Sequence, residues 1–332
     1  MNIRVAVVGA GGIASDHLEA AAKMEELAPC AVADVQEDRA ASMAARYGMK
    51  AYSDYKQMLQ EEKPDIAVIT LPHFLHREAA IFAAEQGCHI LLEKPMALNT
   101  AECDEIAEAV SKAGVKLLVG HTQHYTETNR AAKRWIEEGR LGRLVMMNDR
   151  RHLPYDKPTR PDWFFERAKA GGGILTNLGS HTVDKIQWLI DGRITKVKAS
   201  VDYFLGRGDI EGGGTAFFET SKGIPAAMSQ SGYPGVPIDE TELLFTKGSM
   251  KLISGVGLWV SEGGSYRQVE VSIQENPFVL QFQDLLDSIR EDVEPSCSIA
   301  YSRSVVAVVE SIYLSNQSGC ERIVNQGGEP IA

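Results

Sequence analysis

Short apolar runs alternate with stretches of helical spacing throughout the first third of the chain. Between the runs, apolar residues recur three or four positions apart, as Leu75, Ala79 and Phe82 do. Continuous apolar strands separated by helices are typical of a parallel sheet that is covered on both faces. The pattern therefore predicts an amino-terminal α/β domain with a doubly wound parallel sheet. Its strands are expected at residues 3–8, 30–34, 49–52, 66–71, 88–92 and 116–119.

A glycine-rich turn directly follows the first predicted strand and opens a predicted helix. It has the pattern G-x-G-x-x-A. In such a turn the first glycine allows a tight bend, the second lets the backbone approach a pyrophosphate, and the small last residue lets the helix pack closely on the strand. The amino terminus of the helix then offers N–H groups and a positive dipole end to the phosphates. The predicted cofactor-binding residues of this Rossmann turn are Gly9, Gly11, Gly12, Ile13 and Ala14.

An aspartate ends the second predicted strand, 20 residues after Ala14. A carboxylate at this place accepts hydrogen bonds from the adenosine ribose hydroxyls of NAD, and it would repel the 2′-phosphate of NADP. Asp34 therefore predicts that NAD is the cofactor and that NADP is disfavoured. The alternative interpretation is a helix-capping aspartate beside an ordinary glycine turn.

Composition and charge argue against several other classes of protein. The chain has 332 residues, with 34 Lys and Arg against 45 Asp and Glu, so its formal net charge is −11. A nucleic-acid binder needs a basic surface, so this excess of acidic residues argues against nucleic acid as a partner. No apolar run approaches the roughly 18 residues of a membrane span, and none resembles a signal peptide, so we expect a cytoplasmic protein. The five cysteines form no C-x-x-C pair, which indicates neither a disulfide framework nor a cysteine zinc site.

Two further motifs make the chain resemble a known family. Glu93-Lys94-Pro95 follows the fifth predicted strand, and residues 171–184 have the pattern G-G-G-x-x-x-N-x-G-x-H-x-x-D. Together with the dinucleotide turn, in this order, they resemble the Gfo/Idh/MocA family of NAD(P)-dependent oxidoreductases over nearly the whole chain. The resemblance implies an enzyme that moves hydride between nicotinamide C4 and a hydroxyl or keto carbon of a sugar, polyol or inositol-like substrate. Asn177 departs from the family pattern, which has an aspartate there.

Lys94 and His181 are the predicted catalytic residues. Lys94 follows a strand at the edge where open α/β sheets bind ligands, and its ammonium can bind a substrate hydroxyl and stabilise a developing alkoxide. A histidine titrates near neutrality, so His181 suits the proton transfer of alcohol oxidation. Taken alone, Lys94 reads as a solvated surface lysine and His181 as a structural helical histidine. The family pattern favours the catalytic interpretation of both.

Asn177, His181 and Asp184 are spaced i, i+4 and i+7, so on a helix they share one stripe. An amide can orient a hydroxyl or an imidazole but has no charge to stabilise imidazolium. We therefore predict that Asn177 binds substrate and takes no part in proton transfer. Asp184 either supplies the missing carboxylate or is a structural aspartate on the helix face, and both interpretations stay open.

Residues after the fourth and fifth predicted strands extend the predicted cofactor site. The resemblance implies that the loop after the fourth strand contacts the nicotinamide half. His73 and His76 have the i, i+3 spacing that metal ligands can have, but no carboxylate or cysteine stands nearby. We predict cofactor-loop and helix-capping roles for them, and no metal. The cofactor-binding residues of these loops are Thr70, Pro72, His73, His76, Glu93 and Lys94.

Two other segments are predicted to contact the substrate. In residues 120–125, His124-Tyr125 replaces the Arg-Phe pair that is usual in relatives, a difference that concerns substrate choice. Residues 150–167 form a proline-rich loop whose aromatic side chains could cover a sugar, with Arg150 or Arg160 on its hydroxyls, or could only pack the loop. The predicted substrate-binding residues are Lys94, His124, Tyr155, Trp163, Asn177 and His181.

The rest of the chain predicts an α+β domain. Residues 196–204 and 268–273 alternate apolar and polar side chains. One-sided burial of this kind indicates an open, mostly antiparallel sheet with one face on helices, including 178–190. The glycine run 212–214 is expected to be a turn. We predict an NAD-binding Rossmann domain at 1–121 and a substrate-binding and oligomerisation domain at 122–332, whose helices at 278–290 and 301–316 could pack near the first domain.

The resemblance also implies a homodimer or homotetramer that forms through the open sheet face. Two other functions compete with the sugar or polyol dehydrogenase. The first is an oxidoreductase that acts on a nucleotide-linked sugar or a dihydrodiol. The second is a non-catalytic NAD-binding regulatory protein, which the presence of both Lys94 and His181 disfavours.

Overall fold

The structure of the chain is a computed structural model that describes residues 2–271 and 275–327. The polypeptide divides into two compact units. The first unit combines Met1–Thr122 with Glu275–Arg303, and the second combines Gln123–Gln274 with Ser304–Ala332. Each unit is therefore built from two separate segments of the chain.

The first unit contains a parallel sheet with strand order β3-β2-β1-β4-β5-β6 among its described residues. The apolar runs form its strands because both faces are covered, and every residue of β4 and β6 is buried. The predicted Rossmann sheet is confirmed, with strand ends displaced by up to three residues. The strands are β1 (Ile3–Val8), β2 (Leu27–Ala33), β3 (Lys50–Tyr52), β4 (Ile66–Ile69), β5 (His89–Leu92) and β6 (Leu117–Val119).

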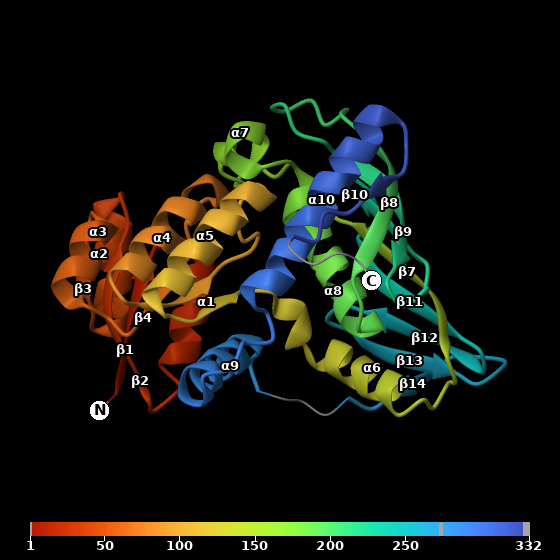
Figure 1. Cartoon of the computed structure of the whole chain (residues 1–332), viewed down its shortest axis with the longest axis horizontal. Helices are drawn as coiled ribbons and strands as arrows, with labels where there is room; N and C mark the ends of the chain where they lie inside the picture. Colours follow the sequence, from red (N-terminus) through yellow and green to blue (C-terminus); the bar gives the residue numbers. More distant parts are fainter. Residues whose placement is uncertain (1, 272–274, 328–332) are drawn as a thin grey trace. The chain divides into compact units, whose positions relative to one another are not determined.

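Helices connect these strands and cover the sheet, with α4 and α5 side by side (Figure 1). The strand order reverses between β1 and β4, which pair in parallel. In open α/β sheets, ligands bind beyond the carboxyl ends of the strands at such a reversal. The helices are α1 (Gly12–Ala21), α2 (Glu37–Tyr47), α3 (Tyr55–Glu62), α4 (His76–Glu85) and α5 (Thr100–Ala113).

A helix from the carboxyl-terminal part of the chain completes the first unit. The helix α9 (Pro277–Glu291) lies beside α1 and also contacts β5 and β6 (Figure 1). Its first position is a proline, and the side chain of the cap residue Asn276 accepts a hydrogen bond from the Phe278 amide. This is the helix that the sequence predicts at 278–290.

The second unit contains a mixed sheet with strand order β14-β13-β12-β11-β7-β10-β9-β8-β15 among its described residues. Only the pairing of β7 with β10 is parallel in this described sheet, so the predicted mostly antiparallel architecture is confirmed. The strands are β7 (Leu144–His152), β8 (Ile194–Asp202), β9 (Gly213–Thr220), β10 (Ala226–Ser231), β11 (Ile238–Phe245), β12 (Gly248–Ile253), β13 (Gly257–Ser261), β14 (Arg267–Val269) and β15 (Arg322–Ile323).

Among the described residues, one face of this sheet packs on helices and the other does not. In β8, Val197 and Ala199 are buried, whereas Lys198 and Ser200 on the other face are exposed, as the alternation predicts. The covering elements include α6 (Glu127–Glu137), α8 (Ser180–Ile190) and the part of α10 (Ile299–Ser318) after Arg303, whose Ser315 accepts from the Ala199 amide. The second predicted alternation, 268–273, continues past β14 into residues 272–274, which lie outside the described residues.

The expectation of a turn at residues 212–214 is wrong for two of the three glycines. Gly213 and Gly214 begin β9. A Cβ at Gly213 would lie 2.7 Å from the Asp202 carboxylate, and a Cβ at Gly214 would lie 3.0 Å from the Ser200 carbonyl oxygen. Glycine normally weakens a strand, but here neighbouring chain segments leave little room for a side chain.

Among the described residues, no helix is both long enough and apolar enough to cross a membrane.

Candidate functional site

The glycine turn after β1 is held against the end of β4. Gly9 has φ +101°, which favours glycine, and its amide donates to the Ala33 carbonyl at 2.8 Å. Thr70 directly follows β4, and its hydroxyl donates to the Gly9 carbonyl at 2.8 Å. A Cβ at Gly9 would lie 3.1 Å from the Thr70 carbonyl oxygen. The first glycine of the motif is therefore favoured by both its conformation and its neighbour.

The amino terminus of α1 is open to a ligand. Gly11 is the cap residue and its helix has no side-chain cap. A Cβ at Gly11 or Gly12 would meet no described atom within 4 Å, whereas Ala14 is fully buried. Ile13, between them, is 36% exposed. The first N–H groups of the helix are thus available to an anion, and this turn fits a pyrophosphate.

The backbone holds the Asp34 carboxylate in place. Its Oδ2 accepts from the Ala10 amide at 2.9 Å, and its Oδ1 accepts from the Gln36 amide at 2.8 Å. Each carboxylate oxygen has a second lone pair that can accept from a ribose hydroxyl. The residues present therefore fit NAD, and the negative charge beside the turn opposes a 2′-phosphate.

A buried histidine ties the loop after β4 to the loop after β5. His76 begins α4, and its Nδ1 and Nε2 each lie 2.8 Å from a backbone carbonyl oxygen, of Pro95 and Leu71 respectively. Burial lowers the pKa of His76, while the two carbonyls oppose this effect. Because both nitrogens contact the backbone, His76 shapes these loops and does not turn a nitrogen toward a ligand.

The other predicted residues of these loops surround His76. Pro72 is the cap residue of a short helix, η1 (His73–Leu75), and the buried His73 ring meets the His76 ring edge-on, with centroids 5.7 Å apart. The Lys94–Pro95 peptide bond is cis, and Lys94 is half-buried. Within the described part of the chain, no group of three or more His, Cys, Asp or Glu residues is arranged to hold a metal ion.

Glu93 is a buried carboxylate directly before Lys94. It accepts from His17 Nε2 at 2.9 Å and from the Lys94 amide at 3.2 Å. Burial raises the pKa of Glu93, but the hydrogen bond from His17 and the charge of Lys94 outweigh burial, so its pKa lies below the usual range. An ionised carboxylate therefore stands beside the predicted catalytic lysine.

In the second unit, the glycine triad encloses another buried carboxylate. The amides of Gly173 and Leu175 donate to Glu211 at 2.8 Å. A Cβ at Gly172 would lie 2.0 Å from the Tyr313 hydroxyl, and a Cβ at Gly173 would lie 2.2 Å from the Glu211 carbonyl oxygen. Burial raises the pKa of Glu211. The triad thus allows close approach of other chain segments.

The triad leads into a π-helical turn, η4 (Leu175–Gly179), and then into α8. The predicted helix at 178–190 therefore begins earlier and with a wider turn than a regular helix has. Asn177 lies in η4 and is buried, and its backbone N–H donates to the Gly173 carbonyl at 3.0 Å. His181 is the second residue of α8 and is half-buried. Single π turns are frequent at functional sites.

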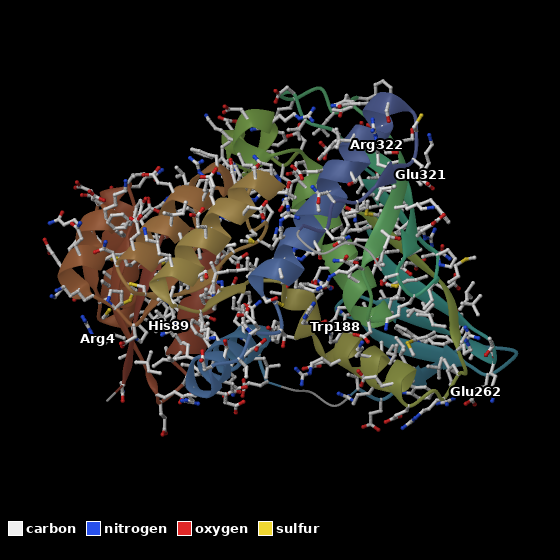
Figure 2. All side chains as sticks on the ribbon, viewed as in Figure 1. Arg4, His89, Trp188, Glu262, Glu321 and Arg322 are labelled. Atoms are coloured by element: carbon white, nitrogen blue, oxygen red, sulfur yellow. The ribbon has the colours of Figure 1, made fainter. Side chains whose placement is uncertain are left out.

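His124 and Asp184 form a buried pair. Asp184 is fully buried, and its Oδ1 lies 2.7 Å from His124 Nε2. The His124 ring stacks on Trp188, labelled in Figure 2, with centroids 4.9 Å apart and an interplanar angle of 20°. Asp184 is thereby the partner of His124 on the helix that carries His181. That His124 contacts substrate stays a prediction.

The predicted sugar-covering loop is held by its own aromatic and arginine side chains. Tyr155 is fully buried, with the Arg160 guanidinium 4.1 Å from its ring centroid. Burial raises the pKa of Tyr155 to about 12, and Asn177 is among the groups that interact with its hydroxyl. Trp163 is half-buried and stacks on Phe164, with the ring centroids 3.8 Å apart. These contacts pack the loop, and a contact of Tyr155 with substrate stays a prediction.

Arg150 lies elsewhere than the sequence interpretation places it. It lies on β7, where its Nε donates to Glu240 at 3.0 Å, and it is exposed. Its neighbours Asp149 and Arg151 are buried on the face that packs on helices. Because side chains alternate along a strand, Arg150 belongs to the open face of the sheet, away from the loop.

Sequence reasoning missed a buried network that fixes α8 on the sheet. The Lys185 ammonium donates to Asp149 at 3.0 Å and to Thr241 at 2.8 Å, and Thr182 donates to Asp149 at 2.6 Å. Lys185 and Asp149 are at most 1% exposed. Breaking such a pair costs roughly 3–5 kcal/mol because it leaves a buried charge. Its only sequence signal is that charged residues occupy inward positions of β7 and α8.

The strand order, the glycine turn and Asp34 define the first unit as an NAD-binding Rossmann domain, and the second unit is the α+β domain that accompanies it. A family model described as "Oxidoreductase family, NAD-binding Rossmann fold" matches residues 3–121, and one described as "GFO/IDH/MocA C-terminal domain" matches residues 129–251. The chain therefore belongs to the Gfo/Idh/MocA family of oxidoreductases, as its motifs predict.

Known relatives include dehydrogenases of sugars and inositols. The chain is 24% identical to inositol 2-dehydrogenase of Salmonella typhimurium, over 99% of both proteins. It is 29% identical to levoglucosan dehydrogenase of Pseudarthrobacter phenanthrenivorans, over 67% of this chain and 60% of that protein. The solved structure of levoglucosan dehydrogenase in complex with NADH has the same fold, with a TM-score of 0.91 at 22% identity over 98% of this chain and 100% of that one.

Proposed function

We propose that the protein is an NAD-dependent dehydrogenase or reductase of a sugar, polyol or inositol-like substrate. The observation that carries the proposal is the position of Lys94, half-buried beyond the carboxyl end of β5, with the ionised Glu93 beside it. Relatives named for inositol and levoglucosan support the substrate class. Neither a nucleotide-linked sugar nor a purely regulatory role has a comparable observation in its favour.

The first unit would hold the cofactor along the carboxyl ends of its strands. The turn at residues 9–14 binds the pyrophosphate, and Asp34 binds the adenosine ribose. The loops at 70–76 and 93–94 contact the nicotinamide half. When bound, NAD supplies the nicotinamide C4 that accepts or donates hydride.

The catalytic roles are divided between Lys94 and His181. The Lys94 ammonium binds the reacting oxygen and stabilises its negative charge as the carbon becomes a carbonyl. His181 takes the hydroxyl proton on its imidazole, directly or through a water. Asn177, uncharged, binds a substrate hydroxyl, and His124, Tyr155 and Trp163 are proposed as further substrate-binding residues.

We also propose that the protein is a cytoplasmic homodimer or homotetramer that assembles through the open face of the second sheet. Met146 and Phe217 expose 37% and 47% of their surface, and each precedes a residue buried on the opposite face. A hollow of about 450 Å³ lies on the sheet, with Arg150, Glu240 and Lys251 in its lining. A face that combines apolar and paired charged side chains suits a contact between identical chains.

Replacing Lys94 with Met tests the proposed chemistry. Lys94→Met keeps the length of the side chain and removes the ammonium, so kcat should fall at least ~100-fold while the NADH dissociation constant changes by less than about threefold. NADH appearance would be followed with sugars, inositols, dihydrodiols and nucleotide-linked sugars as substrates, and binding by NADH fluorescence. Turnover retained in Lys94→Met would refute the role of the lysine.

Tight NADH binding by the native protein without turnover of any substrate would favour the regulatory alternative.

A further inference from the structure

A buried histidine of the cofactor helix contacts the residue that precedes Lys94. His17 lies on α1 with no exposed surface, and its Nε2 is 2.9 Å from Glu93 Oε1. The other oxygen, Oε2, accepts from the Lys94 amide at 3.2 Å. A chain of two hydrogen bonds thus runs from the helix with the phosphate-binding turn to the backbone of the predicted catalytic lysine.

The surroundings of His17 leave it one polar partner. Among the described residues, its Nδ1 is buried without a hydrogen-bond partner. Phe278 and Phe282 of α9 meet the ring edge-on, with centroids 4.9 and 6.1 Å away. A buried N–H without an acceptor is costly, so the ring proton belongs on Nε2, where it is donated to Glu93.

A glycine beside Glu93 leaves room for its carboxylate. A Cβ at Gly120, after β6, would lie 3.2 Å from Glu93 Oε1. The charged or titratable groups with the largest effects on Glu93 are His17 from α1, Lys94 beside it and His76 from α4. His17 and His76 are buried histidines, so of these three groups Lys94 is the one with a permanent positive charge.

We propose that His17 is a positioning residue that keeps Glu93 ionised and oriented, so that Glu93 in turn holds Lys94 in place with its ammonium charged. This inference rests on the proposed function, in which Lys94 needs its proton in order to stabilise the alkoxide. Without the donor from His17, the buried carboxyl group would take up a proton, and Lys94 would lose its neighbouring negative charge.

The first test reads the charge of Lys94 in the protein without cofactor or substrate. Competitive acylation of lysines at a series of pH values, quantified by mass spectrometry, gives the titration midpoint of the Lys94 amine. In His17→Leu, which removes the donor at similar volume, the midpoint should fall by about one pH unit. His17→Gln, whose amide can donate from near the Nε2 position, should keep most of the native midpoint.

Two more variants separate charge from stability. Glu93→Gln removes the charge in nearly the same shape and should lower the Lys94 midpoint as His17→Leu does, which keeps the test available if His17→Leu does not fold. Leu18→Ala, at a fully buried neighbour on α1, should lower thermal stability and leave the midpoint unchanged. A folded His17→Leu or Glu93→Gln with the native midpoint would overturn the inference.

Kinetics provide an independent readout. With an active substrate, kcat of His17→Leu should fall about tenfold, and its KM for NAD should change by less than about threefold. In the plot of kcat against pH, the basic limb of this variant should move to lower pH. His17→Gln should restore kcat and the limb. If the native protein has no activity but the Lys94 midpoint still moves, the proposed function fails while the inferred effect of His17 stands.

Discussion

At the scale of single residues, Gly9 and Asp34 of the proposed cofactor site are fixed by contacts within the first unit. Gly9 has φ +101° and a close neighbour in Thr70, both of which favour glycine, and Asp34 is held by two backbone amides. Both were predicted from the sequence because the motif and its spacing are local. His17 was not, since its partner Glu93 lies 76 positions away and no local pattern links them.

The carboxylate of Asp34 should set the preference for NADH over NADPH. Asp34→Ser removes the charge and shortens the side chain, so we expect the NADH dissociation constant to rise about tenfold and the preference over NADPH to shrink. Asp34→Asn, which keeps the shape, should lose part of the preference through charge alone. Fluorescence titration measures both constants. Tighter binding of NADPH than of NADH by the native protein would contradict the role of Asp34.

At the scale of elements, α3 is fastened to two strands by one carboxylate. Glu62 of α3 pairs with Lys50 of β3 at 2.7 Å and with Arg4 of β1, labelled in Figure 2, at 2.7 Å. It also accepts from the Tyr52 hydroxyl at 2.7 Å. The bonds from Lys50, Tyr52 and Arg4 lower the pKa of Glu62 to about 2.

This shift makes the stability of the first unit depend on pH in a defined direction. Because the folded pKa of Glu62 lies below its unfolded value, its contribution is complete above about pH 5 and is lost as pH falls toward 2. Glu62→Gln should lower the free energy of unfolding by about 2 kcal/mol at pH 7, with allowance for partly exposed partners, and by little near pH 2. Urea denaturation at several pH values measures this difference.

The exposed Glu85 of α4 provides the matched control for that measurement. Glu85→Gln should change the free energy of unfolding by less than about 0.5 kcal/mol at either pH. A Glu62→Gln effect that did not decline toward acid would show that the carboxylate charge is not what stabilises these elements.

The elements themselves divide into those that local patterns predict and those that need distant contacts. Apolar runs identified the strands of the first sheet, and alternation at 196–204 identified β8 of the second, because burial on two faces or one leaves a direct mark on the sequence. The π turn at Leu175–Gly179 and the strand position of Gly213 left no such mark. Both depend on chain segments that approach from elsewhere: Glu211 binds amides 36 and 38 positions earlier, and Asp202 crowds Gly213.

At the scale of the whole molecule, the open sheet face is where assembly should be tested. Phe217→Glu places a charge on that face, and we expect it to dissociate the native oligomer into smaller species in sedimentation velocity experiments. Val236→Glu, in a loop at 81% exposure, should leave the native sedimentation coefficient unchanged. A native protein that sediments as a monomer at every concentration would exclude the proposed assembly.

The two-segment construction of the first unit has a consequence for how the protein is made. The cofactor sheet emerges from the ribosome first, but α9, which packs beside α1 and closes over His17, is encoded only at Pro277–Glu291. The strands of the second sheet from β7 to β14 are all synthesised before it. During synthesis the Rossmann sheet therefore lacks α9 at first. The apolar surroundings of His17 are completed only when most of the polypeptide has been translated.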